Sequence, residues 1–370
     1  MTNNALNLPE INQEQALNLT KFFIQSKQNI FLFGRRGVGK THIAIQAAQE
    51  CKCRVNYINL SVIERPDLAG YPDMNVPGDV INFKSPYFLP PLLDGQKADS
   101  VIIFDEVDKA PQEVTAPLLE ILLFHKINGR PINASACILT GNLLNEGAYS
   151  NQISTALLDR GAKYILTFDF EKWTNWAQAH GVHDLILGFL RSDPTFACGA
   201  IEESSYASPS PRSWTLASEA LLKTKEFKMT DIESVTYIIS GYVGGEAGLR
   251  FKIWYEHYRK FEPYIHALID KNNLSIDFNS LSQTEKLVFI VSACYYVKQK
   301  VLADKSKNRL IYLERLCDFL IQQNVEREVR IAGIYNSFDG DFIAKQKLYS
   351  CQVFFDMFGE LSEGVTINRK

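Results

Sequence analysis

The sequence predicts an α/β core over residues 1–169, in which helices flank a parallel sheet, followed by helical regions over residues 170–262 and 263–370. Three observations predict this organisation. Several strand-like segments are apolar throughout, which is typical of strands buried on both faces. Helical segments alternate with these strands, and that alternation is typical of parallel sheets. From Glu171 onward the spacing of apolar residues becomes helical.

The first element of the core is a helix over Gln15–Gln25, because Ala16, Leu19 and Phe23 recur near one helical face. Strands and helices then alternate. We expect strands at Asn29–Phe33, Val55–Leu60, Ser100–Glu106, Ala136–Asn142 and Tyr164–Phe170, and helices at His42–Glu50 and Glu113–Leu123.

Two stretches interrupt the core. Residues 65–92 are rich in Pro, Gly and Asp and are too long for a plain connection, which indicates an inserted loop or hairpin. Residues 125–132 contain Asn128-Gly129 between short extended flanks, a dipeptide typical of a tight hairpin. Each stretch lies between core elements, so each can project from the body of the domain.

The remainder of the chain is expected to be helical. Expected helices cover residues 172–181, 184–193 and 213–223 in the second region and residues 286–305 and 309–323 in the third. A glycine-rich stretch at 241–248 interrupts the second region. Ser282 and Glu285 have the spacing of a capping box at the start of a helix in the third region.

Composition narrows the class of protein. Hydrophobic residues make up 46% and charged residues 22% of the 370 residues, an ordinary globular balance. The formal charge of −3 gives no general attraction to nucleic acid, so nucleic acid is not the expected partner. Apolar runs fall short of the ~20 residues that span a bilayer, and the seven cysteines show no CxxC pair. These features favour a cytoplasmic protein without a membrane span.

The segment GRRGVGKT, residues 34–41, matches GxxxxGK followed by Ser or Thr, with the preceding strand and following helix that this motif requires. Its glycines let the backbone curl so that amide hydrogens face a phosphate at the helix N-terminus. Lys40 would reach the β- and γ-phosphates, and Thr41 would give its hydroxyl to Mg²⁺. The expected contacts to ATP are Gly34, Gly37, Val38, Gly39, Lys40, Thr41 and His42.

The apolar strand VIIFDE ends in two carboxylates, Asp105 and Glu106. Asp105 is expected to hold Mg²⁺ through water, and Glu106 to orient or deprotonate the attacking water. A kinase with the same loop needs no second acid, so the pair favours hydrolysis over phosphoryl transfer to another substrate. The alternative is an acidic strand end that is merely solvated. The motifs together predict a Mg-dependent ATPase that releases ADP and phosphate.

Five motifs in the order GRRGVGKT, FDEVDKAP, ILTGN, LLDRG and SPRSW resemble an AAA+ ATPase of the MoxR-like group over residues 28–260. The last three, SPRSW above all, narrow the resemblance beyond a generic P-loop hydrolase. It implies an AAA+ P-loop NTPase core up to residue 169 and a helical lid over residues 170–262. Residues 263–370 carry no motif of this resemblance and are expected to form an extra C-terminal helical region, which could bind the partner, close the ring or extend the lid.

The resemblance also implies roles for three residues outside the first two motifs. Asn142 matches sensor 1, which helps to position the attacking water, and Arg212 matches sensor 2 on the lid. Arg160 matches the arginine finger, which completes the site of a neighbouring copy, so hydrolysis would need a homo-oligomeric ring, expected to be a hexamer. Taken alone, each residue would more often be a turn residue or a surface charge. The expected catalytic residues are Lys40, Glu106, Asn142, Arg160 and Arg212.

Two positions depart from the family pattern. Gly161 stands where relatives often carry an aromatic residue, which leaves the packing behind Arg160 open. Asp108 stands where many relatives have Asn, and its carboxylate could alter cation binding or simply face water.

The resemblance implies a chaperone-type remodelling motor acting on a protein client, often one with a von Willebrand factor A domain in similar systems. The two interruptions correspond in position to the helix-2 and pre-sensor-1 inserts of related ATPases. There Tyr71, Phe83, Tyr87 and Phe88 could grip a client, or they could pack the insertion onto its own core. Two alternatives remain: a nucleic-acid motor of the helicase-loader or branch-migration type, and a static ATP-binding scaffold.

Overall fold

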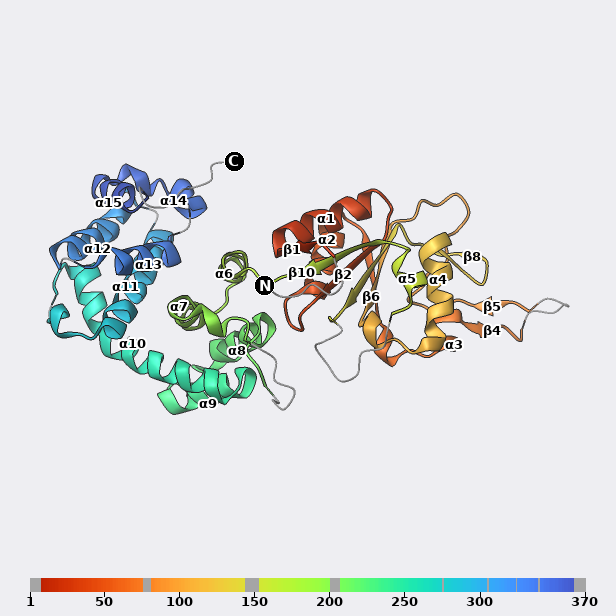
Figure 1. The fold of residues 1–370 in the computed structure, drawn as a ribbon, viewed down its shortest axis with the longest axis horizontal. Helices are drawn as coiled ribbons and strands as arrows, with labels where there is room; N and C mark the ends of the chain where they lie inside the picture. The colour runs from red at the N-terminus through yellow and green to blue at the C-terminus, as the bar shows by residue number, and fades with distance from the viewer. Residues whose placement is uncertain are drawn as a thin grey trace. The chain divides into compact units, whose positions relative to one another are not determined.

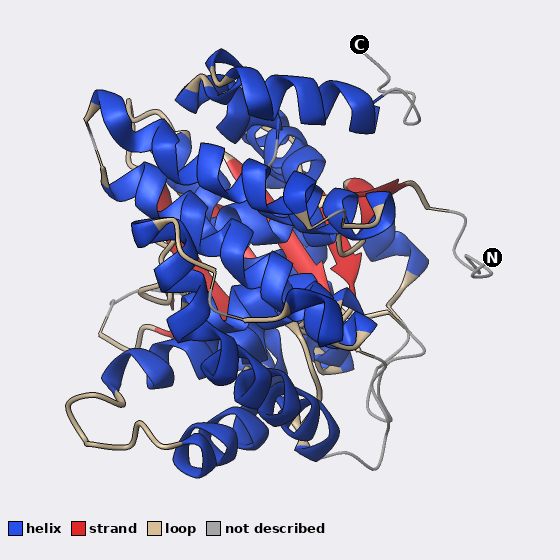
Figure 2. Ribbon diagram, turned by 90° about the vertical axis from the view of Figure 1, so that its left-hand side faces the viewer, coloured by secondary structure: helices blue, strands red, loops and turns tan. Residues whose placement is uncertain are grey.

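The computed structural model describes residues 8–75, 81–143, 153–199, 207–274, 276–304, 306–323, 325–338 and 340–362. The chain divides into two compact units. The first comprises residues 1–177 with 200–205 and 210–212, and the second comprises residues 178–199, 206–209 and 213–370. Within the described residues, all strands belong to the first unit. The strands are red and the helices blue in Figure 2. The predicted α/β core is therefore confirmed.

The core sheet has six parallel strands. Their order across the sheet is β1 (Glu10–Ile11), β10 (Ala162–Leu166), β2 (Ile30–Gly34), β9 (Ala136–Gly141), β6 (Ser100–Asp105) and β3 (Arg54–Asn59). Because all six run in one direction, their carboxyl ends share one edge. The ends of β2, β9 and β6 are neighbours there, at the centre of the sheet.

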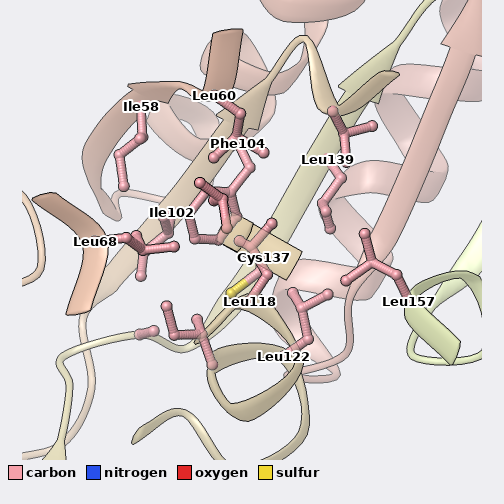
Figure 3. Packing of buried hydrophobic residues seen from close by; sticks show 14 of the residues in the cluster. Ile58, Leu60, Leu68, Ile102, Phe104, Leu118, Leu122, Cys137, Leu139 and Leu157 are labelled. Atoms are coloured by element: carbon pink, nitrogen blue, oxygen red, sulfur yellow. The ribbon is translucent and has the colours of Figure 1, made fainter. Parts of the chain in front are cut away.

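Helices cover both faces of this sheet (Figure 1). Helices α1 (Gln13–Gln25) and α2 (Lys40–Glu50) lie on one face, and α4 (Thr115–Phe124) and α5 (Thr155–Leu158) lie on the other. The second face packs into a buried apolar cluster, part of which is drawn in Figure 3. Its members include Phe31, Phe33, Ile58, Ile102, Phe104, Cys137 and Leu139 from the strands and Leu118, Ile121, Leu122 and Leu157 from the helices. Burial on both faces explains why the strands show no polar alternation.

Both interruptions of the core contain hairpins. Residues 65–92 form α3 (Arg65–Ala69) and a hairpin of β4 (Tyr71–Pro72) with β5 (Phe83–Lys84). Residues 76–80 of this insertion lie outside the described residues. In the second, β7 (Lys126–Ile127) pairs with β8 (Arg130–Pro131). Asn128 and Gly129 have φ values of 49° and 73°, the left-handed conformation that favours this dipeptide in tight hairpins.

The last core strand differs from its predicted bounds of Tyr164–Phe170. Strand β10 begins at Ala162 and ends at Leu166. The amide of Thr167 still donates to the carbonyl of Ile11, but the paired strand β1 ends there. The side chain of Asp169 then accepts from the amide of Lys172 and so caps the next helix. A helix start, rather than strand propensity, decides the conformation of residues 167–170.

The remaining helices mostly follow the predicted pattern. They are α6 (Phe170–Ala179), α7 (Asp184–Ser192), α8 (Pro211–Lys223), α9 (Ile232–Val243), α10 (Gly245–Lys271), α11 (Gln283–Ala303), α12 (Ile311–Gln322), α13 (Arg327–Ser337), α14 (Gly340–Gln346) and α15 (Gln352–Ser362). Single 3₁₀ turns occupy Leu60–Val62, Val107–Lys109, Gln112–Val114, Pro194–Phe196, Phe278–Ser280, Lys307–Leu310 and Leu348–Ser350. Helix α10 is continuous across residue 262, where the second and third regions were expected to meet. None of the helices in the described part of the chain combines the length and apolar character that crossing a bilayer requires.

The predicted capping box begins α11. The hydroxyl of Ser282 accepts from the amide of Glu285, and the Glu285 carboxylate accepts from the amide of Ser282 at 3.1 Å. Lys260 on α10 donates to the same carboxylate at 2.9 Å. Together with the Ser282 donors, the Lys260 hydrogen bond lowers the pKa of Glu285 to about 2. The interaction therefore joins the start of α11 to α10.

Replacing Glu285 by Ala should lower the free energy of unfolding at pH 7 by about 1 kcal/mol, because a cap and an ion pair are lost. The folded-state pKa lies below the unfolded value of ~4.3, so this contribution is complete above that value and disappears as pH falls from about 4 towards 2. Urea unfolding at several pH values measures it. Glu285→Gln is the matched control, since it keeps the cap acceptor without the charge. A Glu285→Ala effect that persists unchanged at pH 2.5 would contradict this account.

Candidate nucleotide-binding site

The loop between β2 and α2 needs glycine at three positions. Gly37 and Gly39 have φ values of +80° and +102°, which L side chains rarely adopt. A Cβ on Gly34 would lie 2.6 Å from the carbonyl oxygen of Leu166 on the adjacent strand. A Cβ on Gly37 would lie 2.9 Å from the hydroxyl of Ser210. The loop is therefore close-packed against its surroundings and turns at backbone angles that only glycine adopts readily.

Helix α2 begins immediately after this loop. Its N-cap is Gly39, which offers no side-chain hydrogen bond to the first turn. The first amide groups of a helix carry partial positive charge and attract anions. The ammonium of Lys40 lies over the same loop, since it donates to the carbonyls of Gly34 at 2.7 Å and Arg35 at 2.9 Å. Loop, helix end and ammonium together form a cradle for phosphate.

Val38 and His42, which are also expected to contact ATP, have separate roles in the local packing. Val38 is buried at 3% exposure and anchors the tip of the loop. The ring of His42 is exposed to solvent and contacts Trp176 edge-to-face at 5.3 Å between ring centroids.

The carboxylate of Asp105 is the centre of a hydrogen-bond network beside the cradle. Thr41 donates its hydroxyl to Oδ2 at 3.1 Å, and Tyr57 donates to the same oxygen at 2.9 Å. The other oxygen accepts from the hydroxyl of Thr140 and from the amide of Glu106. The carboxylate is thus held in one orientation, with the Thr41 hydroxyl beside it.

This pair of oxygen groups suits Mg²⁺. Magnesium is usually bound by one or two carboxylates together with substrate phosphates and water. Thr41 and Asp105 supply the hydroxyl and the carboxylate, and the cradle places phosphate next to them. Among the described residues no group of three or more His, Cys, Asp or Glu side chains is placed to hold a metal by itself. The donor set therefore fits a metal that arrives with a nucleotide.

Glu106 directly follows Asp105 and carries a second carboxylate at the same end of β6. Its backbone is left-handed, with φ of 57°, an unusual conformation for a residue with a long side chain. Burial raises the pKa of Glu106, but hydrogen bonds from Lys109, Ser61 and Asn59 outweigh burial, so the net pKa is lowered. Lys109 contacts Oε1 at 3.0 Å. The carboxylate is therefore ionised at neutral pH and can accept a proton.

Asn142 lies at the end of β9, next to both the cradle and Asp108. Its side-chain oxygen accepts from the Lys40 ammonium at 3.1 Å. Asp108 accepts from both the main-chain and side-chain amides of Asn142 and is 1% exposed. Of the two alternatives for Asp108, the one in which its carboxylate faces water is wrong, because the residue is buried against Asn142.

Arg212 also lies beside the loop. Its amide donates to the carbonyl of Gly37 at 3.3 Å, and its side chain is exposed. The positive charge of Arg212 acts on Tyr57, where it partly opposes the effect of burial on the pKa of that phenol. The side chain is thus available to a nucleotide held in the cradle.

Arg160 lies at the opposite edge of the sheet. Ala162, two residues later, pairs with Ile30 at the start of β2, whereas the cradle begins at Gly34 at its end. That strand is five residues long, about 16 Å at ~3.3 Å per residue. The Arg160 side chain donates to the carbonyl of Ala156 in the preceding helix α5. The structure does not bring Arg160 to the cradle of its own chain.

The structure explains why position 161, next to Arg160, holds glycine where relatives often carry an aromatic residue. A Cβ at this position would lie 2.8 Å from the carbonyl oxygen of Asn29 and 3.0 Å from the ring of Phe31. The backbone before β10 approaches β2 too closely for any side chain. An aromatic residue could not stand here without moving the strand.

Two residues of the Asp105 network, Tyr57 and Thr140, are not among the site residues that the sequence predicts. Both lie on strands next to β6, and both side chains lie on the sheet face that carries Asp105, as the register of the strands requires. Burial, followed by the hydrogen bond to Asp105, raises the pKa of Tyr57 to about 12, so its phenol remains a donor. The alternation of side chains along the two strands could have identified both residues, because it places each of them on the same face of the sheet as Asp105.

Residues 29–160 match a family model described as "AAA domain (dynein-related subfamily)". This segment is therefore similar to AAA domains. The expectation of an AAA+ nucleotide-binding core is confirmed for these residues, and the narrower MoxR-like assignment stays a prediction. A comparison with curated proteins finds no match.

Two solved structures with a low similarity to this chain can be named. The RuvB Holliday junction branch migration motor of Thermotoga maritima is 12% identical, with 90% of this chain and 86% of that chain covered and a TM-score of 0.37. NtrX from Brucella abortus in complex with ADP is 13% identical, with 67% and 64% covered and a TM-score of 0.36.

Replacing Tyr57 by Phe should weaken divalent-metal binding in the AAA domain on the order of tenfold, because an outer donor that orients Asp105 is lost. Electron paramagnetic resonance of Mn²⁺, titrated in the presence of a non-hydrolysable ATP analogue, measures this affinity without turnover. Tyr71→Phe is the matched control, since its hydroxyl contacts only Asp67 at the long distance of 3.4 Å. Equal Mn²⁺ affinity in the two variants would show that Tyr57 plays no part in metal binding.

Proposed function

We propose that this chain is a MoxR-like AAA+ ATPase of the cytoplasm that hydrolyses ATP with Mg²⁺ and uses the energy to remodel a protein partner. The observation that carries the proposal is the convergence of Lys40, Thr41, Asp105, Glu106 and Asn142 at one edge of the sheet. These groups come from the ends of strands β6 and β9 and from helix α2. Their chemistry covers phosphate binding, metal binding and proton acceptance, which hydrolysis requires together.

In this proposal the residues divide the reaction among them. Lys40 and the N-terminus of α2 hold the β- and γ-phosphates, and Glu106 accepts a proton from the attacking water. Mg²⁺, held by Thr41 and Asp105, would shield the charge of the phosphates. Arg212 beside the loop would contact the nucleotide as sensor 2. The lowered pKa of Glu106 keeps its carboxylate ionised at neutral pH, the state in which it can accept a proton.

The position of Arg160 supports a ring. An arginine at the far edge of the sheet cannot serve the cradle of its own chain, but it could enter the cradle of a neighbouring copy. Arginine fingers of this kind contribute ~10³–10⁵ in rate where they have been studied. We therefore propose a homo-oligomeric ring, a hexamer by resemblance, in which Arg160 of one subunit completes the next site.

Exposed apolar side chains on the first insertion support a protein client. Tyr71, Met74, Ile81 and Tyr87 are all exposed, and Tyr87 reaches 93% exposure. Tyr87 contacts Phe88 edge-to-face at 5.2 Å, and Phe88 in turn packs against the buried core cluster. The two interpretations of these aromatics therefore apply to different residues: Phe88 packs the insertion, and Tyr87 is free to contact a client. A von Willebrand factor A domain protein is the client that the resemblance implies.

Replacing Glu106 by Gln should give a protein that binds ATP without hydrolysing it and so retains its client. Adding Tyr87→Ala should abolish that retention while leaving the fold intact, since Tyr87 lies outside the core. Affinity purification with ATP, followed by mass spectrometry and nucleic-acid staining, measures what is retained.

The matched control adds Tyr349→Ala, another exposed tyrosine, to the Glu106→Gln protein. Retention of the same protein by this control and not by the Tyr87→Ala variant supports the proposal. Recovery of nucleic acid instead, released by rising salt, would assign the chain to the nucleic-acid motors.

A further inference from the structure

Asp108 makes a two-pronged contact with Asn142. Its Oδ1 accepts from the main-chain amide of Asn142 at 2.9 Å, and its Oδ2 accepts from the side-chain Nδ2 at 3.2 Å. The carboxylate is 1% exposed and lies in the 3₁₀ turn Val107–Lys109. Gly141 permits this approach, because a Cβ there would lie 3.2 Å from Oδ1 of Asp108 and 3.1 Å from a methyl of Val107.

The side-chain amide of Asn142 therefore lies between two groups of opposite hydrogen-bonding character. Asp108 is on one side and, as a carboxylate, only accepts. Lys40 is on the other side at 3.1 Å and, as an ammonium, only donates. A single orientation satisfies both neighbours: Nδ2 faces Asp108 and Oδ1 faces the cradle. An amide held in the reverse orientation would leave a donor facing a donor and an acceptor facing an acceptor.

We propose that Asp108 is a positioning residue that fixes the Asn142 amide with its oxygen toward the phosphate cradle. This inference rests on the proposed hydrolysis of ATP. When a γ-phosphate draws the Lys40 ammonium toward itself, Oδ1 of Asn142 becomes available as an acceptor for one O–H of the attacking water. The Glu106 carboxylate is the acceptor for the other O–H.

The chemical step balances with these groups. The water oxygen forms a bond to the γ-phosphorus while the bond from that phosphorus to the β–γ bridging oxygen breaks. The proton of the water passes to the Glu106 carboxylate, and the products are ADP and inorganic phosphate. Asn142 neither gains nor loses a proton, so its contribution is the orientation of the water. Asp108 acts only through Asn142.

This role also explains why the residue type at position 108 matters. An asparagine there carries both a donor and an acceptor, so it could pair with either end of the Asn142 amide. The carboxylate removes that choice. The extra charge of Asp108 is thus used inside the protein and is not directed at the cation.

Asp108→Asn keeps the size of the side chain and removes the constraint on Asn142. We expect kcat for ATP hydrolysis to fall on the order of 10- to 100-fold, because the water is no longer oriented in one way. The affinity for a non-hydrolysable ATP analogue should stay within about twofold, since the phosphate cradle is intact. A residue that merely supported the fold would lower binding and thermal stability along with kcat.

The exchange variant Asp108→Asn with Asn142→Asp tests the orientation directly. A carboxylate at 142 presents an acceptor to the cradle in every orientation, and an amide at 108 can donate to it. The double variant should therefore hydrolyse ATP faster than Asn142→Asp alone, in which two carboxylates face each other. Thermal unfolding of each variant verifies that it folds.

Failure of the role of Asp108 and failure of the proposed function give different results. If Asp108→Asn hydrolyses ATP at the wild-type kcat, or if the double variant is no faster than Asn142→Asp, the role of Asp108 is refuted. If the wild-type chain itself fails to hydrolyse ATP under conditions in which it binds the analogue, the proposed function fails instead. Should Asn142→Asp not fold, the double variant is compared with Asp108→Asn, and recovery of kcat again supports the role.

Discussion

The parallel direction of the six strands is the constraint on which the site depends. Because every strand ends at the same edge, the ends of β2, β6 and β9 are neighbours without any further device. Gly34, Asp105 and Asn142 occupy or follow those three ends, and α2 begins at the same edge. The sheet thus brings together a phosphate cradle, a metal carboxylate and a polar amide that are far apart in the sequence.

Polar groups at that edge are costly to bury unless each has a partner. The structure meets this requirement with a connected network in which Asp105 accepts from Thr41, Tyr57, Thr140 and the amide of Glu106. Asp108 and Asn142 extend the network toward Lys40. A network of this kind holds its members in one arrangement, and an arriving phosphate or cation exchanges one partner for another without rebuilding the site. Preorganisation of the groups proposed for catalysis is therefore a by-product of satisfying buried polar atoms.

Much of this arrangement could be predicted from the sequence, because the informative signals are local. Apolar runs located the strands, Asn128-Gly129 located a hairpin, and the glycines of residues 34–41 located the cradle. The two-residue strand β1 and the early end of β10 could not be predicted, since pairing with a distant partner and the Asp169 cap decide them. The contacts of Asp108 could not be predicted either. Asp108 and Asn142 are 34 residues apart along the chain, and nothing in the sequence indicates that they lie close together. Strand register brings residues that are distant in the sequence next to each other, and only the folded sheet defines that register.

We propose above all that the nucleotide site of one copy, made by its cradle and acids, is completed by Arg160 of the next copy. Mixing two inactive variants tests it most directly. Arg160→Ala retains the cradle and Glu106, whereas Glu106→Gln retains Arg160, so a mixed ring contains some sites with every group present. The account predicts that each variant alone is almost inactive, that Arg54→Ala, a surface arginine control, is not, and that mixing the two inactive variants restores ATP hydrolysis. Full activity of Arg160→Ala by itself, or no recovery in mixed rings verified by co-purification, would contradict the claim.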